Sequence, residues 1–206
     1  IDSRYRIGGR DLFLVSLICL AWAGNFLTSK LALNEFPPLL FTGLRLGLLA
    51  LLLIPFLKRP PSGLWPRLVV VALCNGVLHF GLSFWALSLS RTLASPAIVM
   101  QSYVPMATLL AWWLLGERFH WRTGAAIALS FLGVLVLGFD PAVMHSPTAL
   151  LLMLVSAFFL ATGTVLMRNL KGMDPYSQQG WSALIAVLPL LGSSALLEPD
   201  MRVAIV

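Results

Sequence analysis

Residues 93–139 read LASPAIVMQSYVPMATLLAWWLLGERFHWRTGAAIALSFLGVLVLGF, two long apolar runs joined by a short charged turn. The first run covers residues 93–115 and spans about 34 Å as a helix at roughly 1.5 Å per residue, enough to cross a hydrocarbon core of about 30 Å. The second run, residues 123–139, is near the lower length limit for a span. The stretch therefore predicts two membrane-crossing helices and an integral membrane protein.

The composition of the whole chain agrees with this prediction. Of its 206 residues, 59% are hydrophobic and 11% are charged, whereas soluble domains carry about 25% charged residues. The net charge of +6 comes from Lys and Arg in the short gaps between apolar runs, which favours a lipid bilayer and not nucleic acid as the partner. Cys19 and Cys74 lie inside apolar runs and lack the spacing of metal ligands, so we expect packing roles and no cofactor.

Five further apolar runs bring the predicted spans to seven. Their ranges are 12–31, 38–57, 68–88, 93–115, 123–139, 148–167 and 177–197. The connections are short, so consecutive helices are predicted to be antiparallel neighbours. We expect no cleavable signal peptide, because the first run is too long for a signal core and no A-x-A-like site follows it.

The distribution of Lys and Arg predicts a cytoplasmic N-terminus. With the N-terminus inside, 10 basic residues face the cytoplasm and 3 face outward, while Arg45 lies within a span. The inner set is Arg4, Arg6, Arg10, Lys58, Arg59, Arg67, Arg118, Arg122, Arg168 and Lys171, and the outer set is Lys30, Arg91 and Arg202.

A shift of 138 residues places the sixth predicted span on the first and the seventh on the second, with Pro37 on Pro175. One repeat unit then has five spans, and an odd number makes the next unit enter the membrane upside down. We therefore predict a five-helix repeat over residues 1–139 and a partial, inverted second repeat over residues 147–206. Inverted repeats are typical of secondary transporters, which bind substrate near the midplane between repeats.

Three segments in this order resemble the EamA family of the drug/metabolite transporter superfamily. They are AWAGNFLTSKLALNEFPPLLFTGLRLGLLALLL (21–53), LLGERFHWRTGAAIALSFLGVLVL (114–137) and WSALIAVLP (181–189). The resemblance implies a bacterial inner-membrane protein of ten helices in two inverted units that exports amino acids or related metabolites. This chain is then expected to hold one unit and the first two helices of the next, with about three helices missing.

Polar groups inside spans are costly and tend to be functional. Trp22, Asn25, His79, Gln101 and Pro105 all fall near the predicted midplane, at about 1.5 Å of depth per residue. We predict that they form the substrate site. Pro105 is expected to kink its helix and free a carbonyl near Gln101 for a substrate amino group, or to act only as a shape element.

The third span carries Asn75, His79 and Ser83 as one polar stripe. The stripe is either a cavity wall, with His79 as a substrate ligand or proton carrier, or a set of interhelical hydrogen bonds.

Arg45 lies about 10 Å below the outer end of the second span, by residue count. No carboxylate lies deep within a span to pair with it. Three interpretations of Arg45 stay open. It binds the carboxylate of a substrate, its side chain snorkels outward, or it pairs with backbone carbonyls or with residues of a further helix. The 138-residue shift makes Ala183 its counterpart in the second repeat.

The favoured function is a secondary transporter that exports amino acids or related small metabolites by alternating access. A multidrug, nucleoside or sugar transporter of the same superfamily is the alternative. No Walker A, HExxH or Gly-x-Ser-x-Gly motif occurs, so we expect no enzyme; a membrane hydrolase using His79 and Ser83 is a minor hypothesis. A third hypothesis is a truncated unit that functions only with a partner. The sequence does not distinguish a monomer from a homodimer.

Overall fold

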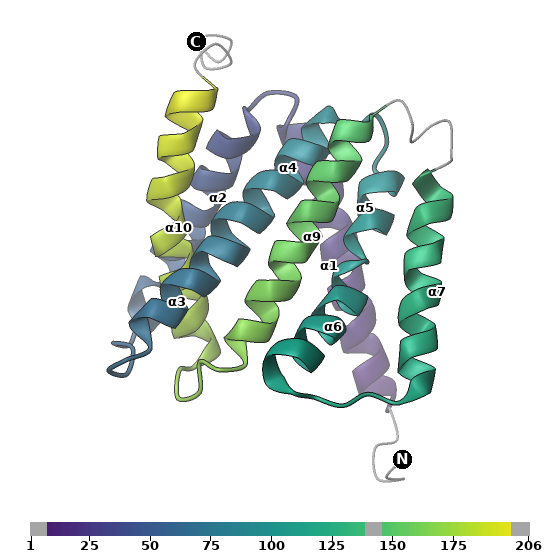
Figure 1. The fold of residues 1–206 in the computed structure, drawn as a ribbon. Helices are drawn as coiled ribbons and strands as arrows, with labels where there is room; N and C mark the ends of the chain where they lie inside the picture. Colours follow the sequence, from purple (N-terminus) through teal and green to yellow (C-terminus); the bar gives the residue numbers. More distant parts are fainter. Residues whose placement is uncertain (1–7, 139–145, 199–206) are drawn as a thin grey trace.

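The computed structural model describes residues 8–138 and 146–198, and every regular element in this part of the chain is a helix (Figure 1). The predicted all-α polytopic membrane protein is confirmed, with six helical stretches long and apolar enough to span a membrane. Arg4, Arg6 and Arg202, used to predict orientation, lie outside the described residues, as do Phe139 and residues 199–206.

The helices follow the predicted spans closely. Their bounds are α1 Gly9–Ala32, α2 Pro38–Leu53 with a short 3-10 turn Ile54–Phe56, α3 Trp65–Ala72, η2 Leu73–His79, α4 Phe80–Leu89, α5 Ala94–Met100, α6 Tyr103–Leu115, α7 Trp121–Gly138, α9 Pro147–Met167 and α10 Pro175–Leu197. The fifth predicted span corresponds to α7. Its described apolar part, Trp121–Val136, is shorter than the other six spans and is not among the candidates.

The third span is one continuous helix that contains a turn of π-helix, η2, between α3 and α4. Such wider turns often occur at functional sites. Gly76 lies within η2, and a Cβ atom built on it would come 2.5 Å from the Cβ of Ala186 on α10. The missing side chain therefore lets the π-turn lie directly against α10.

The fourth span is broken into α5 and α6 at Gln101 and Ser102, in agreement with the kink predicted from Pro105. Pro105 has no N–H to donate to the Gln101 carbonyl one turn earlier. That carbonyl is not free, because it accepts the N–H of Val104 at 3.2 Å. The expectation of an open carbonyl for a substrate amino group at this position is therefore wrong.

The most extensive helix contact joins α2 to α10, which run antiparallel side by side (Figure 1). Each helix begins with a proline and has a glycine five residues later, Gly43 in α2 and Gly180 in α10. A Cβ on Gly43 would lie 3.5 Å from the Cβ of Leu190, and a Cβ on Gly180 would lie 3.2 Å from that of Leu53. Leu190 lies as many residues after the start of α10 as Leu53 lies after the start of α2. The two glycine contacts are therefore equivalent, and the packing is reciprocal.

This packing relates Pro38, and not Pro37, to Pro175, because these are the residues at which α2 and α10 begin. The shift between the two helices is thus one residue smaller than the sequence comparison suggested. Under the corrected shift, Arg45 corresponds to Ser182 and not to Ala183.

A buried carboxylate joins the end of α10 to the start of α2. The backbone N–H groups of Leu39 and Leu40, in the first turn of α2, donate to Glu198 Oε1 at 2.9 Å and Oε2 at 3.2 Å. Glu198 directly follows α10 and is 2% exposed. The carboxylate oxygens accept hydrogen bonds from two N–H groups that have no partner within the helix. The negative charge also complements the positive end of the α2 dipole.

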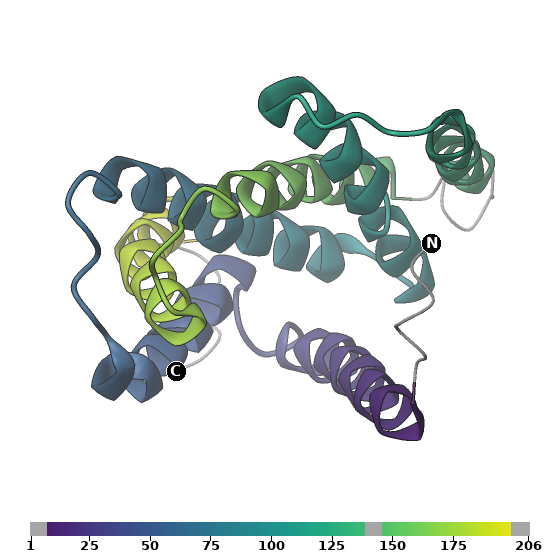
Figure 2. The ribbon, with the colours of Figure 1, turned by 90° about the horizontal axis from the view of Figure 1, so that it is seen from below.

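Helix α1 stands apart from the row formed by α3, α4 and α9 (Figure 2). Within residues 9–32 only Ser29 is buried. The Lys30 ammonium ties the C-terminal end of α1 to the end of α4, because it donates to the carbonyls of Leu87 at 2.8 Å and Ser90 at 2.6 Å. Most of the α1 surface is therefore uncovered in this chain.

We expect Glu198→Ala to lower the free energy of unfolding by about 1–3 kcal/mol, because it removes a charged cap from the start of α2. Glu198→Gln keeps one acceptor and should lose less. Denaturant unfolding in detergent micelles measures both changes. Glu35→Ala, which alters an exposed carboxylate in the neighbouring loop, is the control; an equal loss in the control would contradict the role of Glu198.

Candidate functional site

The first candidate site is a cavity of about 270 Å³ enclosed by α1, α2, η2, α4, α5, α9 and α10. Its wall is mostly apolar, with polar side chains from several helices. The polar lining residues are Asn75, His79, Ser83, Thr164, Gln179 and Ser182; apolar ones include Trp22, Phe26, Met100, Met153 and Met167. A mostly apolar cavity with a few convergent polar groups is typical of a small-molecule site.

His79 is held in the cavity wall by two hydrogen bonds to one residue, Ser156 of α9. The Ser156 hydroxyl lies 2.8 Å from the His79 carbonyl oxygen and 2.9 Å from the His79 Nδ1 atom. The carbonyl can only accept, so the single hydroxyl proton is donated to it, and Ser156 Oγ must accept the proton of Nδ1–H. The neutral imidazole therefore carries its proton on Nδ1, which leaves Nε2 as an acceptor.

Asn75 reaches the cavity one π-turn before His79 and packs on a glycine of α9. A Cβ atom built on Gly163 would collide with the Asn75 side-chain amide. The Asn75 Oδ1 atom is buried and has no hydrogen-bond partner among the described residues. The absence of a side chain at Gly163 is thus what leaves room for Asn75 in the wall.

A second cavity, of about 350 Å³, adjoins the first and contains Arg45. Leu46, Phe80, Phe84 and Gln179 line both cavities and form the boundary between them. The Arg45 guanidinium carbon lies 5.6 Å from the centre of the Phe80 ring and 5.2 Å from that of Phe84, within the range of cation–π attraction. Its Nη1 atom is buried without a hydrogen-bond partner in the described part of the chain.

The structure places the six predicted site residues in three groups. Trp22 and His79 line the first cavity, and Arg45 lines the second. Asn25, Gln101 and Pro105 are absent from both linings; Gln101 is exposed and Pro105 is buried.

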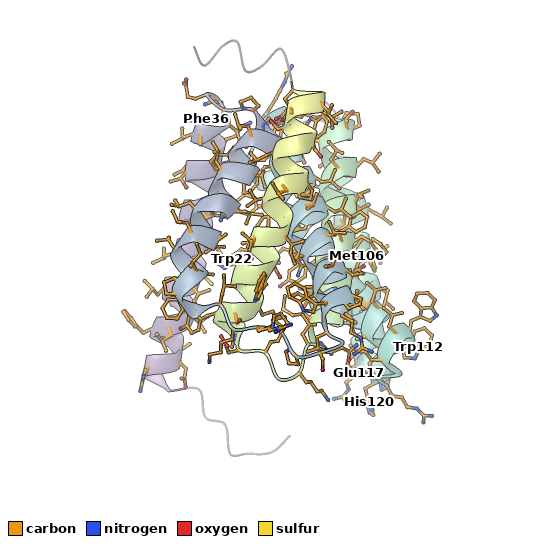
Figure 3. All side chains as sticks on the ribbon, turned by 90° about the vertical axis from the view of Figure 1, so that its left-hand side faces the viewer. Trp22, Phe36, Met106, Trp112, Glu117 and His120 are labelled. Carbon is orange, nitrogen blue, oxygen red and sulfur yellow. The ribbon has the colours of Figure 1, made fainter. Side chains whose placement is uncertain are left out.

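Figure 3 supports the predicted depth of the site. Phe36 lies at one end of the bundle, Glu117 and His120 lie at the other, and Trp22 lies between them. The first cavity, which Trp22 lines, therefore includes the middle of the bundle.

The predicted polar stripe of Asn75, His79 and Ser83 lies along the wall of the first cavity, and His79 also makes the interhelical hydrogen bonds of the alternative interpretation. A hydrolase pair is not formed, because the Ser83 hydroxyl donates to the Phe80 carbonyl at 3.1 Å and His79 Nδ1 is engaged by Ser156. No cluster of three His, Cys, Asp or Glu side chains able to hold a metal ion occurs within residues 8–138 and 146–198.

The sequence interpretation missed Ser156 and Ser182. Both are single hydroxyl residues within apolar stretches, and both are buried in the structure. A polar residue in a predicted span was the available signal, but nothing in the sequence indicates that Ser156 meets His79, which lies 77 residues away.

Comparison with known proteins assigns the chain to a family. The profile of the EamA-like transporter family matches residues 10–139. The chain belongs to this family. It is therefore a multi-pass membrane protein of a transporter family, and the predicted resemblance is confirmed.

Two bacterial relatives carry the description "probable amino-acid metabolite efflux pump". The protein from Salmonella typhimurium is 33% identical over 196 residues and the one from Escherichia coli is 31% identical over 198 residues. Each alignment covers 92% of this chain and 65% of the relative, so the chain spans just under two-thirds of their length. An uncharacterized transporter from Bacillus subtilis is 34% identical over 168 residues, which are 78% of this chain and 54% of that protein. No solved structure matches significantly.

We expect Gly163→Ala to lower the free energy of unfolding by about 1–3 kcal/mol, because the new methyl group overlaps the Asn75 amide. Asn75→Ala in the same chain should recover most of this loss, a non-additivity of about 0.5–3 kcal/mol for residues in contact. Denaturant unfolding of both single variants and the double variant measures the coupling. Gly192→Ala, where a Cβ would meet nothing within 4 Å, is the control, and additive losses would contradict the contact.

We expect ¹⁵N NMR of histidine-labelled protein at neutral imidazole to show His79 with a protonated Nδ1 and a bare Nε2, as its bonds to Ser156 require. Ser156→Ala removes the acceptor and should give a mixture of tautomers. The His79→Gln spectrum assigns the signals among the three histidines. A proton on Nε2 in the wild type would contradict the assignment.

Proposed function

We propose that this chain is part of a secondary transporter that exports amino acids or related small metabolites across the bacterial inner membrane. The observation that carries the proposal is the cavity in the middle of the bundle, where Asn75, His79 and Ser182 converge in an otherwise apolar wall. The efflux-pump descriptions of the two relatives support the substrate class and the direction of transport. The predicted site residues Trp22 and His79 belong to this cavity.

The proposed topology places the N-terminus in the cytoplasm and divides the chain into a five-helix repeat, residues 1–139, and a partial inverted repeat, residues 147–206. The reciprocal, antiparallel packing of α2 on α10 supports the inversion, because a two-fold axis in the membrane plane exchanges two such helices. The excess of Lys and Arg in the predicted inner segments supports the orientation.

Alternating access is the proposed mechanism. The two repeats meet at the cavity, and helix α1 borders the cavity through Trp22 and Phe26 while packing only lightly on its neighbours. A wall helix with few buried contacts can move at low energetic cost, which supports opening and closing of the site around a bound substrate.

A transporter of hydrophobic drugs is the second candidate. It is favoured by the apolar lining, in which three methionines and several aromatic rings provide an adaptable surface. Nucleoside and sugar transport belong to the same alternative but need more polar contacts than this wall offers.

We expect cells that express the protein to raise the external concentration of at least one amino acid, cysteine and O-acetylserine included, in a panel of amino acids and metabolites. His79→Ala should lower the efflux rate roughly tenfold, since a hydrogen bond to a charged group contributes about 1.4 kcal/mol or more. Gln101→Ala, a change outside both cavities, should leave it nearly unchanged. Immunoblots of the membrane fraction control for insertion.

The outcome distinguishes the alternatives. Efflux of drugs, nucleosides or sugars without any amino acid would favour the second candidate. Efflux unaffected by His79→Ala but lost with Gln101→Ala would contradict the proposed cavity and indicate a site around Gln101.

A further inference from the structure

Four buried side-chain nitrogen or oxygen atoms lack a hydrogen-bond partner in the described part of the chain, and three of them belong to residues that line the two cavities. These are Arg45 Nη1, Asn75 Oδ1 and Ser182 Oγ; the fourth is Gln178 Nε2. Buried polar atoms in native proteins are nearly always paired, so each exception needs an explanation. The two adjoining cavities thus have polar residues in their walls, as a site for a small polar molecule requires.

The unpaired groups have opposite hydrogen-bonding character on the two sides of the boundary. In the first cavity, His79 Nε2 accepts because Ser156 holds the ring proton on Nδ1, whereas Asn75 Oδ1 is packed against Gly163. In the second cavity, the Arg45 guanidinium can only donate and carries a full positive charge. A ligand that satisfies both sides needs N–H donors at one end and an anionic acceptor at the other.

No Asp or Glu side chain lines either cavity, within the residues described. Arg45 is therefore accompanied by the faces of Phe80 and Phe84 but by no carboxylate. A cation–π contact contributes less than a bidentate pair with a carboxylate in a site of low dielectric constant. The charge of Arg45 is thus available to a ligand.

We propose that the two cavities bind one zwitterionic α-amino acid in a fixed orientation, with its carboxylate on Arg45 and its ammonium group on His79 Nε2. This inference rests on the proposed transport function and specifies its substrate chemistry: the ligand carries both a free carboxylate and a free amino group.

The separation of the polar groups fits such a ligand. The Arg45 guanidinium carbon lies 5.6 Å from the Phe80 ring centre, which lies 4.7 Å from the His79 ring centre, so Arg45 and His79 are no more than about 10 Å apart. An α-amino acid with one charged hydrogen bond of about 2.8 Å at each end covers roughly this distance. The remaining volume of the first cavity, with Met100, Met153 and Met167 in its wall, accommodates an apolar side chain.

Each single-charge analogue lacks one half of the interaction. An amino-acid methyl ester or the corresponding decarboxylated amine brings a cation near Arg45 without an anion to pair with it. The corresponding carboxylic acid without an amino group leaves His79 Nε2 unpaired. Sites built to pair a polar group reject ligands that lack it, because their own buried groups remain unsatisfied.

The test uses proteoliposomes that contain the purified protein. Uptake of each of the twenty radiolabelled amino acids is measured first. Each transported amino acid is then competed with its methyl ester, its decarboxylated amine and its des-amino acid. For the wild type we expect each analogue to inhibit roughly 10- to 100-fold more weakly than the unlabelled amino acid, the loss typical of a charged hydrogen bond.

Variants assign the two ends. Arg45→Gln should weaken amino-acid uptake at least tenfold and remove the preference for the free acid over its ester, while Arg45→Lys keeps part of that preference. His79→Leu should remove the preference for the amino acid over its des-amino analogue. Arg59→Gln, which changes an exposed arginine that lines neither cavity, is the matched control. Thermal unfolding in detergent checks that every variant is folded.

Two results would overturn the inference and leave the proposed function standing. One is amino-acid uptake by the wild type with equal inhibition by free acids and esters. The other is an unchanged preference for the free acid in a folded Arg45→Gln protein. Uptake of other metabolites but of no amino acid would also overturn it, and a wild type that transports nothing would contradict the transport function itself.

Discussion

The antiparallel contact between α2 and α10 is the constraint on which the rest of the structure depends. Hydrocarbon gives no hydrophobic driving force between helices, so association depends on close packing and internal hydrogen bonds. Gly43 and Gly180 permit the close packing at two reciprocal points. Glu198 fixes the end of the pair at which α2 begins, and Ser177 fixes the opposite end by hydrogen bonds to the backbone of Lys58. Both cavities use this pair of helices as one wall.

Features that depend on local sequence were predictable. Apolar length set the spans, because a helix must cross a hydrocarbon layer of fixed thickness. Pro105 predicted the break between α5 and α6, because proline removes a backbone donor wherever it stands. The stripe of Asn75, His79 and Ser83 predicted a shared face, since their spacing is set within one helix.

Features that depend on distant partners were not predictable. Gln101 and Asn25 have the predicted depth but line neither cavity. Depth follows from residue count, whereas the direction of a side chain depends on helix rotation and neighbours. Ser156 and Glu198 gain their roles only from contacts 77 and 159 residues away along the chain. The π-turn likewise follows from the fit of Gly76 against α10, which no helical period in the sequence expresses.

The attachment of α1 through Lys30 has a consequence for its response to salt. The ammonium is held by carbonyl oxygens at the end of α4, which are dipoles, and by no carboxylate within residues 8–138 and 146–198. When such a contact separates, no buried anion is left behind, and water can replace the ammonium at the carbonyls. Ion–dipole contacts are short in range, so dissolved ions screen them less than they screen a pair of separated charges. The hold on α1 should therefore vary little with ionic strength, unlike that of the exposed Glu117–Arg168 pair at the other end of the bundle.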